Sequence, residues 1–367
     1  MALFFTAVGI LCAICGVLAA ALVLADRYVN NYGLCRIDIN NGSESLEVEG
    51  GDTLLGSLGA QKIFIPSACG GRGSCGLCKL KVSSGGGQVL PTEEPHLSKA
   101  EIADNIRLSC QLKVRNDMAI EIPEELFKIQ EYLATVQSIT DLTHDIKLIR
   151  IALREPAEIS FTPGQYIQLE CPPYKLNPEA VYRAYSVASD PADSGYIDLI
   201  IRLVPDGICT TWVFEFMEER QQITLNGPYG DFYIREGESE MIFIAGGSGM
   251  APFRSILAEL ERKGCQRPIR YFFGALTARD LFCVEEMKAY ENRLHDFKFI
   301  PALSEPAPED KWEGETGLIT EVVGRYYQNC SDKQAYLCGS PGMIDACINV
   351  LKELDMGEDN IFYDKFG

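Results

Sequence analysis

Cys69-Gly70-Gly71-Arg72-Gly73-Ser74-Cys75-Gly76-Leu77-Cys78 places three cysteines within ten residues, and a fourth, Cys110, follows after 31 intervening residues. The spacing is therefore C-x5-C-x2-C-x31-C. Glycine adopts the positive φ angles that let a backbone wrap around a bound group, and it leaves N–H groups free to face sulfur. Thiolates gathered on such a loop predict a metal centre whose ligands are Cys69, Cys75, Cys78 and Cys110.

The spacing narrows the kind of metal centre. Plant-type [2Fe–2S] ferredoxins use C-x4-C-x2-C with a distant fourth cysteine, so this loop has one more residue between the first two ligands. A structural zinc site usually combines two close pairs of ligands, and here only Cys75 and Cys78 form such a pair. Free thiols are the remaining alternative, but buried free cysteines seldom stand between glycines. The loop predicts a [2Fe–2S] cluster.

Length and charge limit the class of protein. A chain of 367 residues is long enough for two or three domains. The net charge of −19 argues against nucleic acid as a partner, because phosphate binding needs clustered Lys and Arg. The 14 cysteines show no pairing pattern of a disulfide framework, which is typical of a reducing compartment.

The first 25 residues contain no charged side chain. A helix over Ala2–Ala25 would be roughly 36 Å long, enough to span a hydrocarbon core of about 30 Å. A cleaved signal peptide is the alternative, but it would have a positive first region and a shorter apolar core. Residues 1–25 are therefore predicted to form a transmembrane helix, with Cys12 and Cys15 as small residues at its surface.

Residues 33–126 predict a small β-grasp-like ferredoxin domain around the cysteine loop. Polar and apolar residues alternate over Cys35–Ile39 and Leu46–Glu49, and Asn41-Gly42 between them predicts a hairpin turn. Asp52-Thr53 then caps a short apolar helix that continues to Leu58. The other expected elements are a strand over Lys79–Val82, a helix after His96 and a last element over Arg107–Gln111.

Residues 130–237, after a linker over Pro123–Ile129, predict an antiparallel β-barrel. Short β-rich runs follow one another, separated by Gly and Pro and without a helical period. The runs are Leu133–Ile139, Ile146–Leu153, Tyr166–Leu169, Tyr196–Val204 and Gln222–Leu225.

Residues 238–367 predict an α/β domain with a doubly wound parallel sheet, because strands and helices alternate. The expected strands are Met241–Ala245, Ile269–Ala275, Phe297–Leu303 and Ala335–Cys338. The expected helices are Pro252–Leu260, Glu285–Leu294, Leu318–Tyr327 and Met343–Leu354.

Three stretches of the barrel region together favour a nucleotide-like ligand. In Arg183-Ala184-Tyr185-Ser186, the Arg can bind a diphosphate, the Tyr can pack on an aromatic ring and the Ser can hydrogen-bond a ring nitrogen. An ordinary strand is the alternative. The turn Val204–Thr210 adds a glycine and a hydroxyl suited to phosphate, and Gly227–Phe232 follows one strand later.

A second nucleotide site is predicted at Gly246-Gly247-Ser248-Gly249-Met250-Ala251-Pro252. This turn follows a strand and precedes a helix, so its N–H groups are able to face a pyrophosphate. Pro252 is expected as the first residue of the helix. Cys338-Gly339-Ser340-Pro341 ends a later strand, and ligands bind at the carboxyl ends of such sheets.

The motifs RxYS, GPYG, GGxGxxP and CGxP resemble, in kind and order, those of the ferredoxin–NADP⁺ reductase superfamily, here joined to a ferredoxin. With the N-terminal helix included, the chain resembles the F subunits of sodium-translocating NADH:quinone reductases. This resemblance implies FAD-binding residues Arg183, Tyr185, Ser186, Gly207, Thr210 and Tyr229. It implies nicotinamide nucleotide residues Gly246, Gly247, Gly249, Cys338, Gly339 and Pro341. Phe366 is expected to stack on the flavin, and Ser186, Cys338 and Phe366 are the expected catalytic residues.

The resemblance also implies an activity. Electrons are expected to pass from NADH to FAD, to [2Fe–2S] and to other membrane subunits of a quinone reductase complex, since a flavin links hydride donors to one-electron centres. NADH is favoured over NADPH because no clear basic pair follows the strand ending at Gly274, although Arg279 is nearby. A bacterial inner membrane with the redox domains in the cytoplasm is expected. The alternatives are the reductase component of an oxygenase and a non-catalytic electron-carrier subunit.

Overall fold

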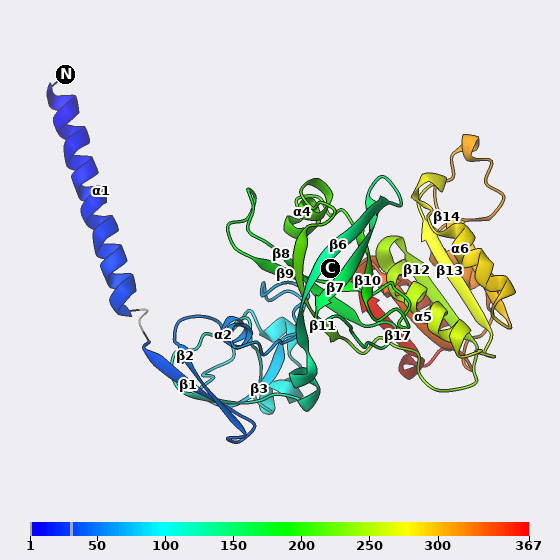
Figure 1. Ribbon diagram of the computed structural model, residues 1–367, viewed down its shortest axis with the longest axis horizontal. Helices are drawn as coiled ribbons and strands as arrows, with labels where there is room; N and C mark the ends of the chain where they lie inside the picture. The colour runs from blue at the N-terminus through cyan, green and yellow to red at the C-terminus, as the bar shows by residue number, and fades with distance from the viewer. Residues whose placement is uncertain (1, 30–31, 367) are drawn as a thin grey trace. The chain divides into compact units, whose positions relative to one another are not determined.

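The computed structural model describes residues 2–29 and 32–366 (Figure 1). The chain divides into two compact units. The first comprises Met1–Ser67 and Gly71–Lys128, and the second comprises Ala68–Gly70 and Ile129–Gly367.

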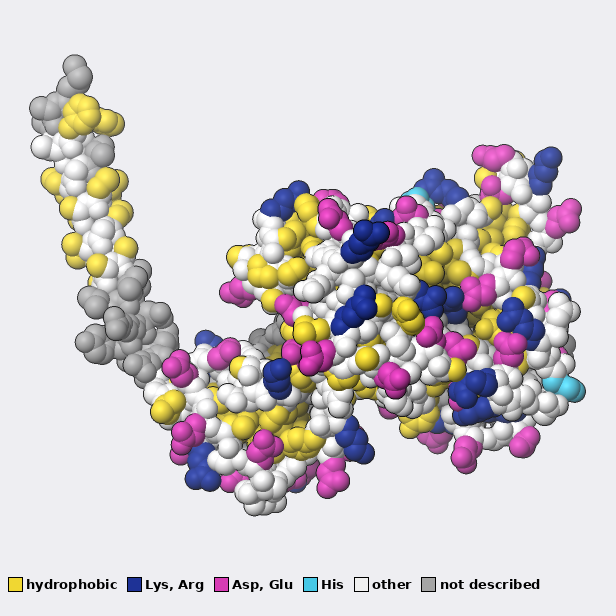
Figure 2. Space-filling view, viewed as in Figure 1, with side chains coloured by type: hydrophobic (Ala, Val, Ile, Leu, Met, Phe, Trp, Pro, Cys, Tyr) yellow, Lys and Arg dark blue, Asp and Glu magenta, His cyan; other side chains and the backbone are white. Residues whose placement is uncertain are grey.

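Helix α1, Ala2–Val29, has 28 residues, which gives a length of about 42 Å. Its segment Phe4–Ala21 is long and apolar enough to cross a membrane. In Figure 2 the coloured part of α1 shows hydrophobic but no charged side chains, whereas both charges are interspersed over the rest of the visible face. Residue 1 of the predicted span lies outside the described residues.

The rest of the first unit is built on a five-stranded sheet in the order β2-β1-β5-β3-β4. Only the pair of β1 and β5 is parallel. The turn between β1 and β2 has positive φ at Asn40, Asn41 and Gly42, as the predicted hairpin requires. The strands are β1 Leu34–Ile39, β2 Glu44–Glu49, β3 Lys79–Ser84, β4 Ile106–Leu108 and β5 Met118–Glu121.

Two short helices of this unit begin where the sequence predicts, because a side chain caps each of them. The hydroxyl of Thr53 accepts a hydrogen bond from the Gly56 N–H at 3.0 Å and starts α2, Leu54–Ala60. Ser98 and Glu101 form a capping box that starts α3, Lys99–Ala103. Strand β5 was not predicted. Three of its four residues, Met118–Ile120, pair with β1, some 80 positions earlier, so its position depends on a long-range contact.

A buried ion pair holds β4 in place. The side chains of Glu93 and Arg107 are 0% and 4% exposed, and Arg107 Nη2 lies 2.6 Å from Glu93 Oε2. Glu93 Oε1 also accepts a hydrogen bond from the Leu108 N–H at 2.8 Å. Burial raises the pKa of Glu93, but the hydrogen bonds from Arg107 and backbone N–H groups outweigh burial and lower that pKa overall. The pair therefore fixes the strand that ends two residues before Cys110.

The second unit begins with a six-stranded antiparallel sheet in the order β10-β7-β6-β11-β8-β9. Val187, just after β9, forms an antiparallel bridge with Leu199 of β10, so the two edge strands approach each other there. Trp212 of helix α4 is buried against the sheet. The elements are β6 Gln130–Asp141, β7 Ile146–Glu155, β8 Tyr166–Cys171, β9 Val181–Ser186, β10 Tyr196–Arg202, α4 Ile208–Glu215 and β11 Gln222–Tyr229.

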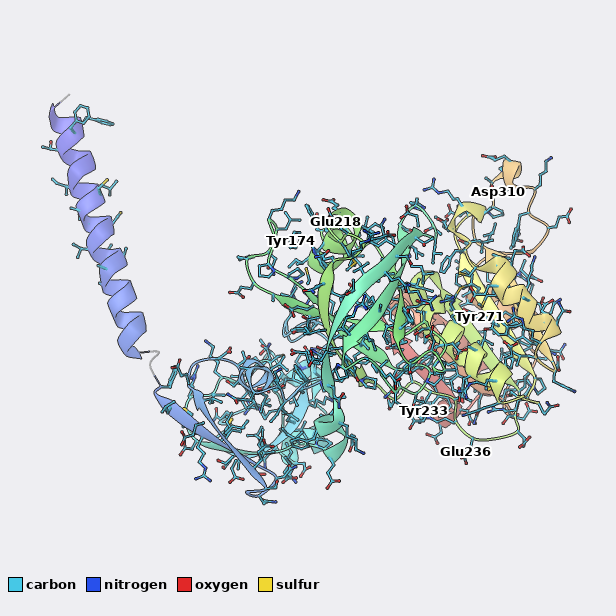
Figure 3. All side chains as sticks on the ribbon, in the orientation of Figure 1. Tyr174, Glu218, Tyr233, Glu236, Tyr271 and Asp310 are labelled. Carbon is cyan, nitrogen blue, oxygen red and sulfur yellow. The ribbon has the colours of Figure 1, made fainter. Side chains whose placement is uncertain are left out.

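The remainder of the second unit contains a parallel sheet in the order β15-β14-β13-β12-β16-β17. Alternate residues face opposite sides. Phe243 and Tyr271 belong to the core under α5 and α6, while Ile242 and Phe272 belong to the core under α7 and α8. Figure 3 labels Tyr271. The strands are β12 Met241–Gly246, β13 Ile269–Ala275, β14 Phe297–Leu303, β15 Glu315–Thr316, β16 Gln334–Gly339 and β17 Ile361–Lys365. The helices are α5 Met250–Arg262, α6 Val284–Ala289, α7 Ile319–Tyr326 and α8 Pro341–Glu353.

Several helix boundaries differ from the predicted ones, and the largest difference is at the end of α6. Helix α5 begins at Met250, so Pro252 is its third residue and not its first. Proline is tolerated there because the first-turn N–H groups have no partner within the helix. Helix α6 ends at Ala289 and continues as a 3₁₀ turn, not as an α-helix to Leu294. The 3₁₀ turns are Glu94–His96, Glu124–Lys128, Gly247–Gly249, Ala278–Asp280, Tyr290–Asn292, Pro308–Asp310 and Glu358–Asn360.

Candidate functional site

The cysteine loop joins α2 to β3 without regular secondary structure. Cys69, Cys78 and Cys110 are buried, and Cys75 is half-buried. Cys78 precedes β3 and Cys110 follows β4; these strands pair with Lys79 opposite Leu108, and the Ser109 N–H donates to the Cys78 carbonyl at 2.9 Å. A hydrogen bond between the two thiols, together with burial, raises the pKa of Cys78. Strand pairing thus brings the most distant predicted ligand next to the loop.

The backbone of the loop requires glycine. Gly73 has φ of 74°, and a Cβ atom there would lie 2.6 Å from Gln111 Nε2. That same Nε2 donates to Cys110 Sγ at 3.5 Å. The loop therefore folds tightly over the residues that follow β4, which agrees with a chain wrapped around a bound group.

Within residues 2–29 and 32–366, no three Cys, His, Asp or Glu side chains gather closely enough to hold a single metal ion. A [2Fe–2S] cluster divides four thiolates between two irons, so its ligands form pairs and do not converge on one point. Cys78 and Cys110 are in contact, and thiolates are the usual donors of a [2Fe–2S] cluster, so the donor set fits such a cluster.

The predicted flavin motif lies on β9. Arg183 and Tyr185 share one face of the strand, and Ser186 occupies the other. Arg183 Nη1 donates to the Tyr182 carbonyl at 2.7 Å, and the Tyr185 hydroxyl contacts the thiol of Cys209 on α4. The strand therefore presents a cation and an aromatic ring side by side.

The turn before α4 lies close to this strand. Gly207 is the N-cap of α4, and the Thr210 hydroxyl donates to the carbonyls of Val204 and Gly207, each at 3.3 Å. Tyr174 (labelled in Figure 3) donates its hydroxyl to the Ile208 carbonyl at 2.6 Å. Thr210 thus shapes the turn whose N–H groups are suited to phosphate.

Tyr229 is placed differently from the other predicted cofactor residues. It is buried, it stacks on Tyr166 with ring centroids 5.4 Å apart, and its hydroxyl donates to Asn226 Oδ1 at 2.6 Å. These contacts hold the side chain within the antiparallel sheet.

The two turns of the parallel sheet meet at its carboxyl edge. Gly246, Gly247 and Gly249 connect β12 to α5, and Gly339 and Pro341 connect β16 to α8. A Cβ atom at Gly249 would overlap the carbonyl oxygen of Cys338, so this approach is possible only for glycine. The sequence prediction that both turns share one edge agrees with this contact.

Asp364 of β17 links β9, called the flavin strand because it carries the predicted flavin motif, to this edge of the parallel sheet. The sequence predicted no role for Asp364. Asp364 lies opposite Cys338 in the parallel register, and the Ser186 hydroxyl donates to its Oδ2 at 3.4 Å. Phe366, half-buried, donates its N–H to the Gly339 carbonyl at 2.8 Å. Of the predicted catalytic residues, Ser186 and Cys338 therefore lie beside this carboxyl group, and Phe366 lies at the same edge through its bond to Gly339. The signal in the sequence that points to Asp364 is its position two residues before the predicted site residue Phe366.

The surroundings of Asp364 change its protonation. Its pKa is raised to about 6, chiefly by burial and also by the charge of nearby Asp231, against the lowering effect of the Ser186 hydrogen bond. The Cys338 thiol is fully buried, and burial followed by the charge of Asp364 raises its pKa well above the ordinary value. The site therefore offers a neutral thiol beside a carboxyl group that titrates near neutral pH.

Comparison with protein families identifies the three regions. Residues 37–115 match the 2Fe-2S iron-sulfur cluster binding domain, 133–234 the oxidoreductase FAD-binding domain, and 243–348 the oxidoreductase NAD-binding domain. These matches define the class as NAD-dependent flavoprotein oxidoreductases with an iron–sulfur domain, and they confirm the predicted [2Fe–2S], FAD and NADH cofactors.

The particular family follows from curated relatives. The F subunit of the Na(+)-translocating NADH-quinone reductase of Mannheimia succiniciproducens is 36% identical, with 99% of each chain covered. That of Neisseria meningitidis is 38% identical, with 96% of each covered. The chain belongs to the family of F subunits of Na(+)-translocating NADH-quinone reductases, as the sequence resemblance predicted.

Solved structures resemble the chain over most of its length. An Amycolatopsis cytochrome P450 reductase has 26% identity and a TM-score of 0.73, and the match covers 90% of this chain and 98% of that one. The ferredoxin reductase in carbazole 1,9a-dioxygenase has 26% identity and a TM-score of 0.70, and the match covers 91% and 99%.

Proposed function

We propose that this chain is a membrane-anchored, NADH-oxidising flavoprotein subunit of a sodium-translocating NADH:quinone reductase. Its electrons pass from NADH to FAD, to the [2Fe–2S] cluster and then to a membrane partner. FAD, when bound, accepts a hydride and passes on electrons singly. The observation that carries this function is that nearly the whole chain, with all three cofactor regions, belongs to the family of F subunits.

Arg183, Gly207 and Thr210 are assigned to the FAD diphosphate, since they supply a guanidinium and a helix start close together. Tyr185 packs on the isoalloxazine ring and Ser186 hydrogen-bonds one of its nitrogens. Tyr229 supports the same site through the sheet in which it is buried. The bridge between the edges of this sheet supports the antiparallel barrel predicted for residues 130–237.

The nicotinamide nucleotide is assigned to the carboxyl edge of the parallel sheet. Gly246, Gly247 and Gly249 face its pyrophosphate, and Cys338, Gly339 and Pro341 line the opposite side. Phe366 covers the place where nicotinamide enters. The Asp364 carboxyl group, whose pKa burial raises to about 6, accepts a hydrogen bond from Ser186 Oγ at this edge and takes up a proton as the pH falls through about 6. Helix layers on both faces of this sheet support the doubly wound fold predicted for residues 238–367.

Cys69, Cys75, Cys78 and Cys110 are assigned to the cluster, in a domain over residues 33–126. Helix α1, with residues 1–25 as the span, anchors the chain in the bacterial inner membrane and leaves the redox domains in the cytoplasm. Other subunits of the complex receive the electrons. The segment Phe4–Ala21 supports the anchor, since apolar side chains lie along its described part.

Two measurements test this function. The full chain, purified from membranes in mild detergent and loaded with FAD, is expected to oxidise NADH with ferricyanide as acceptor. No NADH oxidation would favour a non-catalytic electron carrier. Recovery of the chain in the soluble fraction would favour the reductase component of an oxygenase, the class to which the two structural relatives point.

A further inference from the structure

Arg254 leaves α5 and contacts three other segments of the second unit. Its Nη1 donates to Asp198 Oδ2 on β10 at 2.9 Å and to the Ala188 carbonyl at 3.4 Å. Its Nε donates to Glu286 Oε1 on α6 at 2.7 Å. The planar guanidinium serves several acceptors at once, which a lysine at the same position would be unable to do.

Asp198 is the buried partner in this arrangement. It is 4% exposed, and its Oδ1 lies 3.2 Å from Arg150 Nε without the alignment of a hydrogen bond. Arg150 in turn pairs with Asp193 at 2.9 Å. Burial alone would lower the pKa of Arg254, but Glu286 and Asp198 raise it overall. Loss of Arg254 would leave the buried Asp198 carboxylate with the poorly aligned contact to Arg150, which is costly, so the Arg254 contact holds one geometry firmly.

The segments joined by Arg254 carry the two halves of the proposed hydride-transfer site. Asp198 lies in the FAD-binding region and Arg254 in the NAD-binding region. Ala188 is two residues beyond Ser186, and its N–H donates to the Asp198 carbonyl at 2.8 Å. Arg254 follows the Gly247–Gly249 turn on the helix that this turn starts. One side chain therefore connects β10 and the segment just after the flavin strand β9 to the helix that follows the dinucleotide turn.

We propose that Arg254 is a positioning residue for hydride transfer, which sets the dinucleotide turn against the flavin strand through Asp198 and Ala188. This inference rests on the proposed function. Arg254 contacts neither ligand in this role. The hydrogen bond between Ser186 and Asp364 is a second connection between the same halves, so loss of Arg254 shifts their relative position without separating them. Displacements of about 1 Å are enough to slow such a step by up to about a hundredfold.

The test compares Arg254→Met and Arg254→Lys in the full-length, FAD-loaded chain. Arg254→Met is expected to slow flavin bleaching by NADH in stopped flow by about tenfold to a hundredfold. Its FAD content and its equilibrium affinity for NAD⁺, measured by calorimetry, are expected to stay within about threefold of wild type, a change below 1 kcal/mol. Arg254→Lys keeps one charged contact, so its rate of flavin bleaching is expected to lie between those of wild type and Arg254→Met.

Arg270→Met is the matched control. Arg270 pairs with Asp296 at 2.9 Å, and both residues lie within the NAD-binding region. Its loss is expected to leave flavin bleaching unchanged. If Arg254→Met does not fold, Asp198→Asn decides, because it removes the same ion pair from the other side. If Arg254→Met and Asp198→Asn both fold, the variant with both substitutions is expected to bleach flavin no more slowly than the slower single variant.

The inference is overturned if Arg254→Met, or Asp198→Asn in its place, bleaches flavin at the wild-type rate. A parallel loss of FAD content, NAD⁺ affinity and rate also overturns it, since that result means general destabilisation. Failure of the wild-type chain to reduce flavin with NADH would instead refute the proposed function.

Discussion

The cysteine loop and the proposed hydride-transfer site around Ser186, Cys338 and Asp364 are built in opposite ways. Three of the four predicted cluster ligands lie within ten consecutive residues, and the fourth follows a strand paired to the loop's own strand. The hydride-transfer site instead joins two sheets, and its Ser186–Asp364 contact spans 178 residues. A local site is therefore damaged chiefly by loss of a ligand, whereas an assembled site is damaged by displacement of its parts.

Replacement of Cys75 by Ser tests whether the two sites are independent, and it has the largest expected effect. The variant is expected to lose the visible absorption and the EPR signal of the cluster while NADH still bleaches the flavin. Cys35→Ala is the control, because Cys35 is a buried core cysteine of the same unit outside the loop. Loss of both the cluster signal and flavin bleaching in Cys75→Ser would contradict separate sites.

Replacement of Glu93 by Gln tests the buried Glu93–Arg107 ion pair, which holds the strand before Cys110 in place. Arg107 would remain buried without its partner, and the unfolding free energy of the first unit is expected to fall by about 3–5 kcal/mol. Urea unfolding, monitored through the loss of cluster absorption, measures this change in unfolding free energy. Because the pKa of Glu93 is lowered on folding, its contribution is present above the ordinary glutamate pKa and is lost as the pH falls.

The control is Asp104→Asn, which removes an exposed ion pair with Lys81 and should cost no more than about 1 kcal/mol. An equal effect of the two substitutions would mean that the buried pair does not brace the cysteine site.

Replacement of Asp364 by Asn tests the proposed hydride-transfer site. Its effect on stability is expected to be smaller than that of Glu93→Gln. The pKa of Asp364 is raised to about 6 on folding, so its stabilising contribution is full below the unfolded pKa and is lost as the pH rises through 6. Wild type is therefore expected to lose up to about 3 kcal/mol between pH 4 and pH 7 that the variant does not lose. Chemical unfolding across this range, with Asp345→Asn as an exposed control, measures the difference. Identical pH profiles of wild type and Asp364→Asn would refute the raised pKa.

Prediction from the sequence succeeded where a signal is contained in a few neighbouring residues. Thr53 and Ser98 cap short helices near the predicted positions, and the hairpin at Asn41-Gly42 formed. Strand β5 and the Glu93–Arg107 pair were missed because their partners are distant in sequence. The start of α5 was placed two residues late, since the turn of glycines already adopts helical hydrogen bonding before Pro252.

The sequence by itself determined the order of the three cofactor regions and the apolar N-terminal helix, and it predicted the four cysteine ligands. Each of these depends on residue type and spacing along the chain. Only the tertiary structure placed Asp364 beside Ser186 and Cys338, and only it joined Arg254 to Asp198. The physical reason is that contacts across sheets are selected by packing and burial, and these bring together groups that no local pattern relates.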